Sequence, residues 1–244
     1  NNIGLVLQVK GDYDGALDMI RKCLAISEAT LGTEHSLTAT SYNNIGSVLK
    51  AKGDYDGAID MYRKCLTIDE ATLGTEHPDT AMSYNNIGLV LQAKGDYDGA
   101  LDMYRKGLTI REATLETEHP DTAMSYNNIG LVLQAKGDYD GAIDMYRKCF
   151  TIREATLGTE HPNTAMSYNN IGGVLKAKGD YDGAIDMYRK CLTIQEATLG
   201  TEHPNTAASY NNIGLVLQAK GDYDGALDMY RKGLTIQEAT LGTE

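Results

Sequence analysis

The sequence contains no tryptophan and a single phenylalanine, and its basic residues are fewer than its acidic ones. The 22 Lys and Arg residues face 34 Asp and Glu residues, which gives a formal net charge of −12. Because phosphate binding depends on Lys and Arg, this balance argues against nucleic acid and against an anionic membrane as partners. The longest apolar runs extend over only a few residues, so none can span a bilayer as a helix.

Tyrosine takes the place of the missing aromatic residues, with 16 copies that recur at fixed positions of a repeated unit. The sequence Asn-Asn-Ile-Gly recurs every 42 residues, at Asn1, Asn43, Asn85, Asn127, Asn169 and Asn211. Repetition at this period predicts stacked supersecondary units rather than a globular domain. Three tyrosines in each complete unit then serve as its bulky packing residues.

We predict one array over residues 1–244. Its repeats fall at about 1–38 (partial), 39–80, 81–122, 123–164, 165–206 and 207–244 (partial). The chain opens without a methionine and partway through a unit, so we interpret it as part of a longer array.

The first half of each unit has the pattern of a helix. In the third copy, the spacing of Tyr84, Ile87 and Val90 predicts a helix over about residues 80–94. Gly95 follows at the position where a left-handed residue ends a helix.

The second half predicts another helix over about residues 97–115, capped by the carboxylate of Asp96. We expect its buried stripe to consist of Tyr97, Ala100, Leu101, Tyr104, Leu108 and Leu115. Gly99 in the first turn suggests a close approach between helices. The two-residue break makes an antiparallel hairpin whose apolar face must be covered by its neighbours. The predicted fold is therefore all-α, an α-solenoid of stacked antiparallel helix hairpins.

The patterns Tyr84-x-x-Ile87-Gly88-x-x-Leu91 and Ala100-x-x-x-Tyr104 resemble the tetratricopeptide repeat. The 42-residue length, the Leu-Gly-x-Glu-His-Pro segment and the paired Asn are similar to the kinesin light chain type of this repeat. The resemblance implies a right-handed superhelix. It also implies a non-enzymatic, cytoplasmic scaffold that binds a protein or peptide without a cofactor.

The same resemblance places a peptide groove on the concave face, lined by the first helix of each hairpin. Carried over, the peptide-binding residues include the first Asn of each pair, Asn43, Asn85, Asn127, Asn169 and Asn211. The second Asn adds Asn86, Asn128 and Asn170. A carboxamide donates and accepts hydrogen bonds, so it suits the amide groups of a peptide. The alternative is that the second Asn ties one hairpin's backbone to the next.

Further along this helix face the copies differ. One column contains Leu89 and Leu131, and a second contains Gln92, Gln134, Lys50 and Lys176. Ser47 accompanies Lys50, and Gly173 accompanies Lys176. This variation fits either local tuning of a groove or drift on a solvated face. With only two lysines in the column, the pattern argues against a carboxylate clamp and against recognition of acidic peptides.

No catalytic or metal site is predicted. Cys23, Cys65, Cys149 and Cys191 share one column and are expected to be small buried thiols in a reducing cytoplasm. Equivalent atoms of stacked units lie about 10 Å apart, too far for a disulfide. The histidines His35, His77, His119, His161 and His203 are each one repeat apart, which favours loop packing over a shared metal ion.

Two functional classes remain open. The first is a scaffold that binds a peptide segment of a partner. The alternative is a structural spacer or self-association module, such as a sensor arm of a larger multidomain protein. Neither end of the sequence has a polar capping helix, so we expect possible end-to-end association through the terminal repeats.

Overall fold

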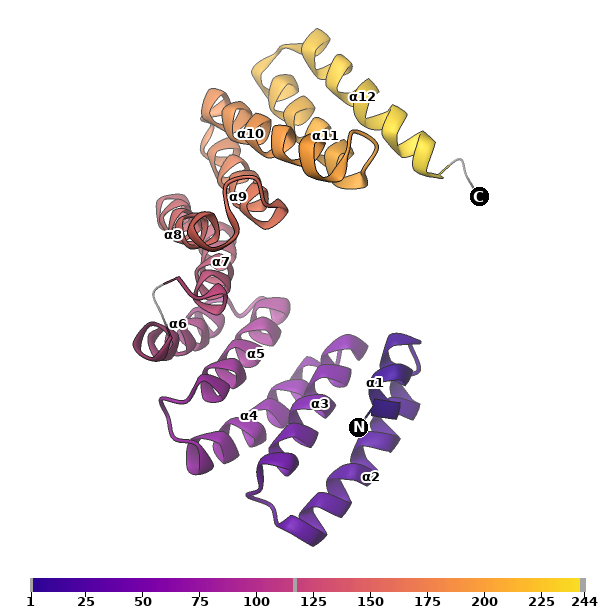
Figure 1. The fold of residues 1–244 in the computed structure, drawn as a ribbon, viewed down its shortest axis with the longest axis vertical. Helices are drawn as coiled ribbons and strands as arrows, with labels where there is room; N and C mark the ends of the chain where they lie inside the picture. The colour runs from indigo at the N-terminus through magenta and orange to yellow at the C-terminus, as the bar shows by residue number, and fades with distance from the viewer. Residues whose placement is uncertain (1, 116–117, 242–244) are drawn as a thin grey trace. The chain divides into compact units, whose positions relative to one another are not determined.

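The computed structural model describes residues 2–115 and 118–241, which form twelve α-helices and no strand (Figure 1). The helices are α1 (Asn2–Val9), α2 (Tyr13–Leu31), α3 (Ser36–Lys52), α4 (Tyr55–Thr72), α5 (Pro78–Lys94), α6 (Tyr97–Thr114), α7 (Pro120–Ala135), α8 (Tyr139–Leu157), α9 (Pro162–Lys178), α10 (Tyr181–Leu199), α11 (Pro204–Lys220) and α12 (Tyr223–Leu241). Odd-numbered helices are the first helices of the hairpins, and even-numbered helices are the second. The predicted all-α fold is confirmed.

The break within each hairpin has the predicted chemistry. Gly95 adopts φ 82° and ψ 5°, the left-handed conformation that ends α5. The Asp96 carboxylate then accepts a hydrogen bond from the Gly99 backbone N–H at 3.0 Å and caps α6. Pro78 occupies the first turn of α5, where a missing N–H costs no helical bond.

The reason for Gly99 differs from our expectation. A Cβ atom at Gly99 would lie 2.5 Å from Oδ2 of Asp96, so the glycine makes room for the cap rather than for another helix. Close helix approach occurs instead at Gly88, where an added Cβ would lie 2.7 Å from the ring of Tyr104. The small Gly88 on the first helix therefore leaves room for the large Tyr104 ring on the second helix.

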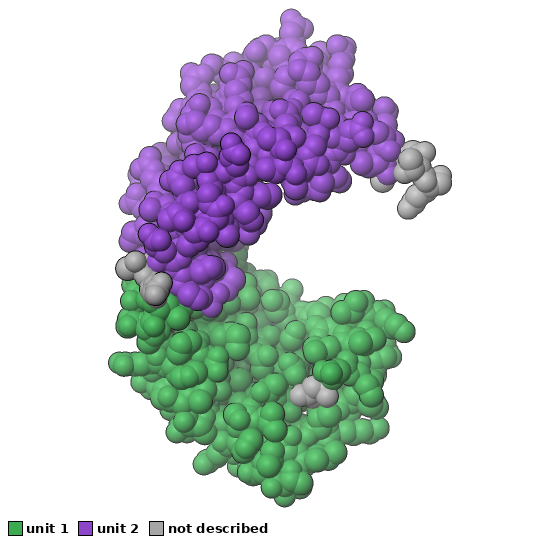
Figure 2. Space-filling view, viewed as in Figure 1, with its two compact units in different colours: residues 1–116 green, residues 117–244 purple. Residues whose placement is uncertain are grey.

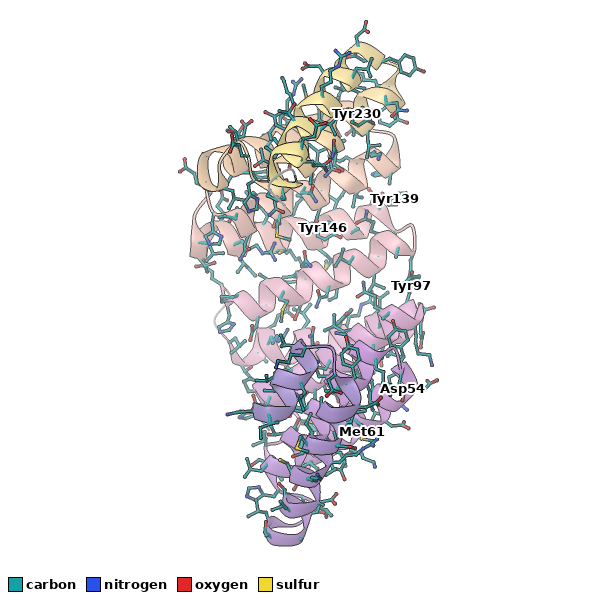
Figure 3. All side chains as sticks on the ribbon, turned by 90° about the vertical axis from the view of Figure 1, so that its right-hand side faces the viewer. Asp54, Met61, Tyr97, Tyr139, Tyr146 and Tyr230 are labelled. Atoms are coloured by element: carbon teal, nitrogen blue, oxygen red, sulfur yellow. The ribbon has the colours of Figure 1, made fainter. Side chains whose placement is uncertain are left out.

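The core of each hairpin lies between its two helices. Val90, Ala100 and Tyr104 are at most 1% exposed, and the equivalent Tyr146 lies among the helices of its unit (Figure 3). The predicted stripe was wrong at Tyr97, which is 36% exposed because it begins α6 next to the turn of the hairpin. Leu108 and Leu115, also predicted to be buried, are half-buried. Ile110 is buried instead, one turn before the end of α6.

The chain forms two compact units, residues 1–116 and 117–244 (Figure 2). Unit 1 contains α1 to α6, and unit 2 contains α7 to α12. Within each unit, the second helix of every hairpin packs against the first helix of the same hairpin. Where another hairpin follows, the second helix also packs against the first helix of that next hairpin. The stacked hairpins predicted from the period are thereby confirmed within each unit. The boundaries of the six repeats and the hand of the superhelix remain predictions.

Ion pairs connect successive hairpins on the surface. Lys52 Nζ lies 2.6 Å from Oδ1 of Asp14, and Lys178 makes the equivalent pair with Asp140 in unit 2. Such exposed pairs contribute about 0–1 kcal/mol each, so burial rather than charge holds the stack together. Within the described residues, no helix has the length and apolar character needed to cross a membrane.

Candidate functional site

The paired asparagines form a ladder on the first-helix face, by which we mean the surface made by the first helices of successive hairpins in one unit. Asn86 Nδ2 donates to Oδ1 of Asn43 at 2.9 Å in unit 1. In unit 2, Asn170 donates to Asn127 at 3.0 Å and Asn212 donates to Asn169 at 2.9 Å. The second Asn therefore does tie neighbouring hairpins together, but through the side chain of the first Asn rather than through the backbone.

The ladder uses only part of the hydrogen-bonding capacity of each carboxamide. In the Asn127–Asn170 pair, the bond occupies one lone pair of Asn127 and one N–H of Asn170. The amide nitrogen of Asn127 and the oxygen of Asn170 take no part in this bond, and both side chains are half-buried. One rung can thus present a donor and an acceptor together, which is the set that a peptide main chain requires.

Not every asparagine in the predicted set is equally accessible. Asn85 and Asn128 are only 7% and 8% exposed. Asn211 lies against α12, because a Cβ atom at Gly233 would be 2.6 Å from Asn211 Oδ1. The structure therefore brings Asn43, Asn127 and Asn169 to half-buried positions on the first-helix face.

Exposed apolar side chains accompany the ladder in unit 2. Met124 and Leu131 on α7 are 40% and 38% exposed, Met166 on α9 is 51% exposed, and Leu215 on α11 is 44% exposed. Leu89 occupies the same column on α5 in unit 1 and is half-buried. Exposed apolar area next to carboxamide groups is suitable for a peptide segment that carries both apolar and polar side chains.

The predicted glutamines are engaged by tyrosines of the same hairpin. Tyr104 donates its O–H to Gln92 Oε1 at 2.8 Å, and Tyr146 donates to Gln134 Oε1 at 3.1 Å. Burial raises the pKa of Tyr146, which keeps its hydroxyl protonated as a donor. The glutamine oxygens are therefore used within the hairpin, and their amide nitrogens take no part in these bonds.

Lys50 and Lys176 replace this glutamine in the middle hairpin of each unit, and both are half-buried. Among the described residues, neither lysine has an ion-pair partner. In unit 1, the Ser47 side chain lowers the pKa of the Tyr62 hydroxyl, although burial is the larger effect and raises that pKa to about 12. Ser47 therefore lies near Tyr62 in the hairpin that carries Lys50.

A polar cluster inside unit 1 was not anticipated from the sequence. Ser83 donates to Oδ2 of Asp69 at 2.7 Å, and the Cys65 thiol donates to the same oxygen at 3.4 Å. All three side chains are buried. Burial raises the pKa of the Cys65 thiol to about 12, so the thiol is a poor nucleophile and the cluster joins α4 to α5 without reactive chemistry.

The histidines cap helices, a role that the expectation of loop packing did not include. His77 Nδ1 accepts a hydrogen bond from the Asp79 backbone N–H at 3.1 Å, at the start of α5. The same contact begins α3, α7, α9 and α11. The described residues contain no group of three or more His, Cys, Asp or Glu side chains that could hold a metal ion.

A family model described as tetratricopeptide repeat matches residues 1–71, 39–113, 79–155, 121–197 and 167–239, which together cover nearly the whole chain. No curated protein sequence matches significantly.

Several solved structures share the fold. BtubC (BKLC) from P. vanneervenii superimposes with a TM-score of 0.79 at 20% identity, covering 96% of this chain and 91% of that one. A putative kinesin light chain from Podosopora anserina, with nearly identical TPR-like repeats, gives 0.75 at 25% identity over 85% and 98% of the two chains. MamA from Desulfovibrio magneticus RS-1, residues 41 to the end, gives 0.61 at 17% identity over 82% and 96%.

Proposed function

This chain belongs to the tetratricopeptide repeat family, and we propose that it is a non-enzymatic scaffold that binds a peptide segment of a partner protein. The proposed binding surface is the first-helix face of each unit, with Asn43 in unit 1 and Asn127 and Asn169 in unit 2. The observation that carries the proposal is the asparagine ladder, in which each rung pairs two residues 43 positions apart and keeps one donor and one acceptor for a ligand.

Peptide backbone recognition follows from this geometry. A bound segment donates an N–H to the oxygen of Asn170 and accepts from the amide nitrogen of Asn127, in a manner independent of its side chains. Its apolar side chains contact Leu131 and Met166, which are exposed beside the ladder. The net charge of −12 disfavours nucleic acid in the same surface. The four cysteines are free thiols, which supports a reducing compartment such as the cytoplasm.

A random peptide library selected on the purified chain tests the proposal. Leu131→Gln and Leu215→Gln remove apolar area from the first-helix face. The control Ala155→Gln introduces the same residue at an exposed position of α8, away from that face. We expect peptides that bind the parent and the Ala155 variant but not the double leucine variant. Peptides retained by all three proteins would place binding on another surface, and no selected peptide would argue against the scaffold.

The terminal hairpins favour a second candidate function, a spacer that associates end to end. Leu227 and Leu234 on α12 are 49% and 52% exposed, whereas Leu101, the inner equivalent of Leu227, is 5% exposed. On α1, Ile3 is 66% exposed, whereas its inner equivalent Ile45 is 3% exposed. The positions of Leu227 and Ile3 are thus ones that are buried in the inner repeats.

Light scattering over a range of concentrations tests this alternative. Leu227→Lys with Leu234→Lys should keep the chain monomeric, while Ala239→Lys, on a column exposed in every repeat, should leave association unchanged. A parent that is strictly monomeric at high concentration would contradict the spacer.

A further inference from the structure

Two polar contacts join each hairpin of unit 2 to the hairpin that follows it. Between the hairpin of α9 and α10 and that of α11 and α12, the Lys220 ammonium pairs with the Asp182 carboxylate, and Asn212 donates to Asn169 at 2.9 Å. In both contacts the later hairpin supplies the N–H donor and the earlier hairpin supplies the oxygen acceptor. A junction between two hairpins therefore has a direction.

The two donors of this junction recur at α1 without acceptors. Lys10, just after α1, stands at the position of Lys220, and Asn2 stands at the position of Asn212. Both residues are exposed. Among residues 2–115 and 118–241, neither the Lys10 ammonium nor the Asn2 carboxamide has an ion-pair or hydrogen-bond partner.

The two acceptors recur in the last hairpin of unit 2 without donors. Asp224 on α12 stands at the position of Asp182, and Asn211 on α11 stands at the position of Asn169. Within the part of the chain that the structure describes, the Asp224 carboxylate has no ion-pair partner and the Asn211 oxygen accepts no hydrogen bond. The polar groups of one junction are thus divided between the first and the last hairpin.

The apolar residues of the junction are divided in the same way. Inside unit 2, Ile185 on α10 and Ile213 on α11 belong to one core cluster and are 7% and 1% exposed. Their equivalents are Leu227 on α12, which is 49% exposed, and Ile3 on α1, which is 66% exposed. Val6 on α1 is 56% exposed, although the valine at this position is fully buried in every later repeat.

We propose that α1 of one molecule docks on α12 of a second molecule of this chain, so that the two continue the stack head to tail. The three pairs that form are Lys10 with Asp224, Asn2 with Asn211, and Ile3 with Leu227. A second molecule is the occupant because each open group on one hairpin meets, on the other, the same kind of residue that it contacts inside a unit.

This inference rests on the second candidate function, and it specifies which surfaces meet and in which direction. Two α1 surfaces placed together would set donors against donors, and two α12 surfaces would set acceptors against acceptors. The contact is therefore heterologous, so each associated molecule keeps one open surface and the assembly grows beyond a dimer. Because α1 has 8 residues and α11 has 17, the junction is smaller than an inner one, and association should require a high protein concentration.

Two blocked variants test the direction of assembly. Ile3→Lys with Val6→Lys blocks α1, and Leu227→Lys with Leu234→Lys blocks α12. Circular dichroism first establishes that both variants fold. In sedimentation velocity we expect the parent to grow with concentration and each blocked variant to stay monomeric. An equimolar mixture of the two variants should form a 1:1 dimer that does not grow further, because it contains one open α1 surface and one open α12 surface.

The other outcomes separate the junction from the spacer. Association of either blocked variant by itself would mean that like surfaces meet, which would overturn the head-to-tail junction and leave the spacer standing. A parent that associates while the mixture stays monomeric would place the contact on another surface, with the same consequence. A parent that is monomeric at high concentration would overturn both the junction and the spacer.

Charge reversal tests the junction with variants that keep the exposed apolar residues. Lys10→Glu and Asp224→Lys should each weaken association about 5-fold or more at low ionic strength, because reversal turns the attraction of an exposed pair into repulsion. The protein that carries both changes should recover the parental association. The control Arg105→Glu makes the same change in net charge at an exposed position of α6 and should have no effect. Equal association in all these proteins, or no recovery in the double variant, would overturn the pairing of α1 with α12.

Discussion

His161 Nδ1 accepts a hydrogen bond from the backbone N–H of Asn163 at 3.0 Å, so the imidazole is the N-cap of helix α9. The histidine found at this position of each repeat therefore caps the start of a helix. A cap satisfies one of the backbone N–H groups that the first turn leaves without a partner.

Replacement of this cap should destabilise unit 2. His161→Ala is expected to lower the free energy of unfolding by about 0.5–2 kcal/mol, the usual contribution of an N-cap. His161→Asn should retain most of it, because asparagine is itself a good cap. Urea denaturation of both variants measures the difference. Equal losses in the two variants would mean that loop packing, not capping, is what the histidine supplies.

Because Asp96 caps the second helix, one substitution at Gly99 should change the stability in opposite directions with and without the Asp96 side chain. Gly99→Ala should destabilise the chain, because the new Cβ would lie 2.5 Å from the Asp96 carboxylate that caps α6. In an Asp96→Ala background the same substitution should stabilise by about 0.5–1 kcal/mol, since the cap is already gone and alanine is the better helix former. Thermal unfolding of the four proteins measures the cycle, and additive effects would contradict this explanation.

Two glycines on first helices of unit 2 should respond in opposite directions. A Cβ atom at Gly130 would lie 2.7 Å from the Tyr146 ring, so Gly130→Ala should cost about 1–3 kcal/mol through overpacking. At Gly173 the nearest atom is 3.6 Å away, so Gly173→Ala should be neutral or stabilising by up to about 1 kcal/mol. Denaturation midpoints compare the two, and a similar loss in both would exclude the tyrosine as the cause.

These contrasts show what the sequence could and could not predict. The hairpins followed from the 42-residue period and from Gly95 and Asp96, because turn and cap chemistry is local. The caps made by His77 and its equivalents were missed, since histidine is not among the usual N-cap residues. Tyr97 was assigned to the core from periodicity alone. Periodicity does not take into account that Tyr97 lies next to the turn of the hairpin, where it is partly exposed.

The candidate site was predictable as a column of residues but not as a set of contacts. Asn43 and Asn86 were both named, yet their bond joins residues 43 positions apart and depends on how the hairpins stack. The joint change of Ser47 and Lys50 was visible in the sequence. The nearness of Ser47 to Tyr62 was not, because Tyr62 lies on the other helix of the hairpin.

Alkaline pH should unfold the chain through its tyrosines. Burial raises the Tyr84 pKa to about 12, and its hydrogen bond to Glu70 adds to this. For Tyr210 the bond to Glu196 is the larger cause, again to about 12. A raised pKa in the folded state means stability that is fully present below pH 10 and lost as the pH rises towards 12. Circular dichroism and tyrosinate absorbance should therefore change together, and ionisation completed before any unfolding would contradict the prediction.

The asparagine ladder should appear as coupling between hairpins. Asn127→Ala and Asn170→Ala break the same hydrogen bond, so the double variant should lose less stability than the two single changes combined, by about 0.5–1.5 kcal/mol. Asn127 and Asn212 belong to different rungs, and their cycle should be additive. Since stacked repeats are coupled to their nearest neighbours, hydrogen exchange in α7 and α9 should report the loss along with urea denaturation. Equal coupling in both cycles would mean that the coupling comes from the general packing of α9 and not from the hydrogen bond between the two asparagines. Any polar pair could then replace the donor and the acceptor on which the proposed peptide surface depends.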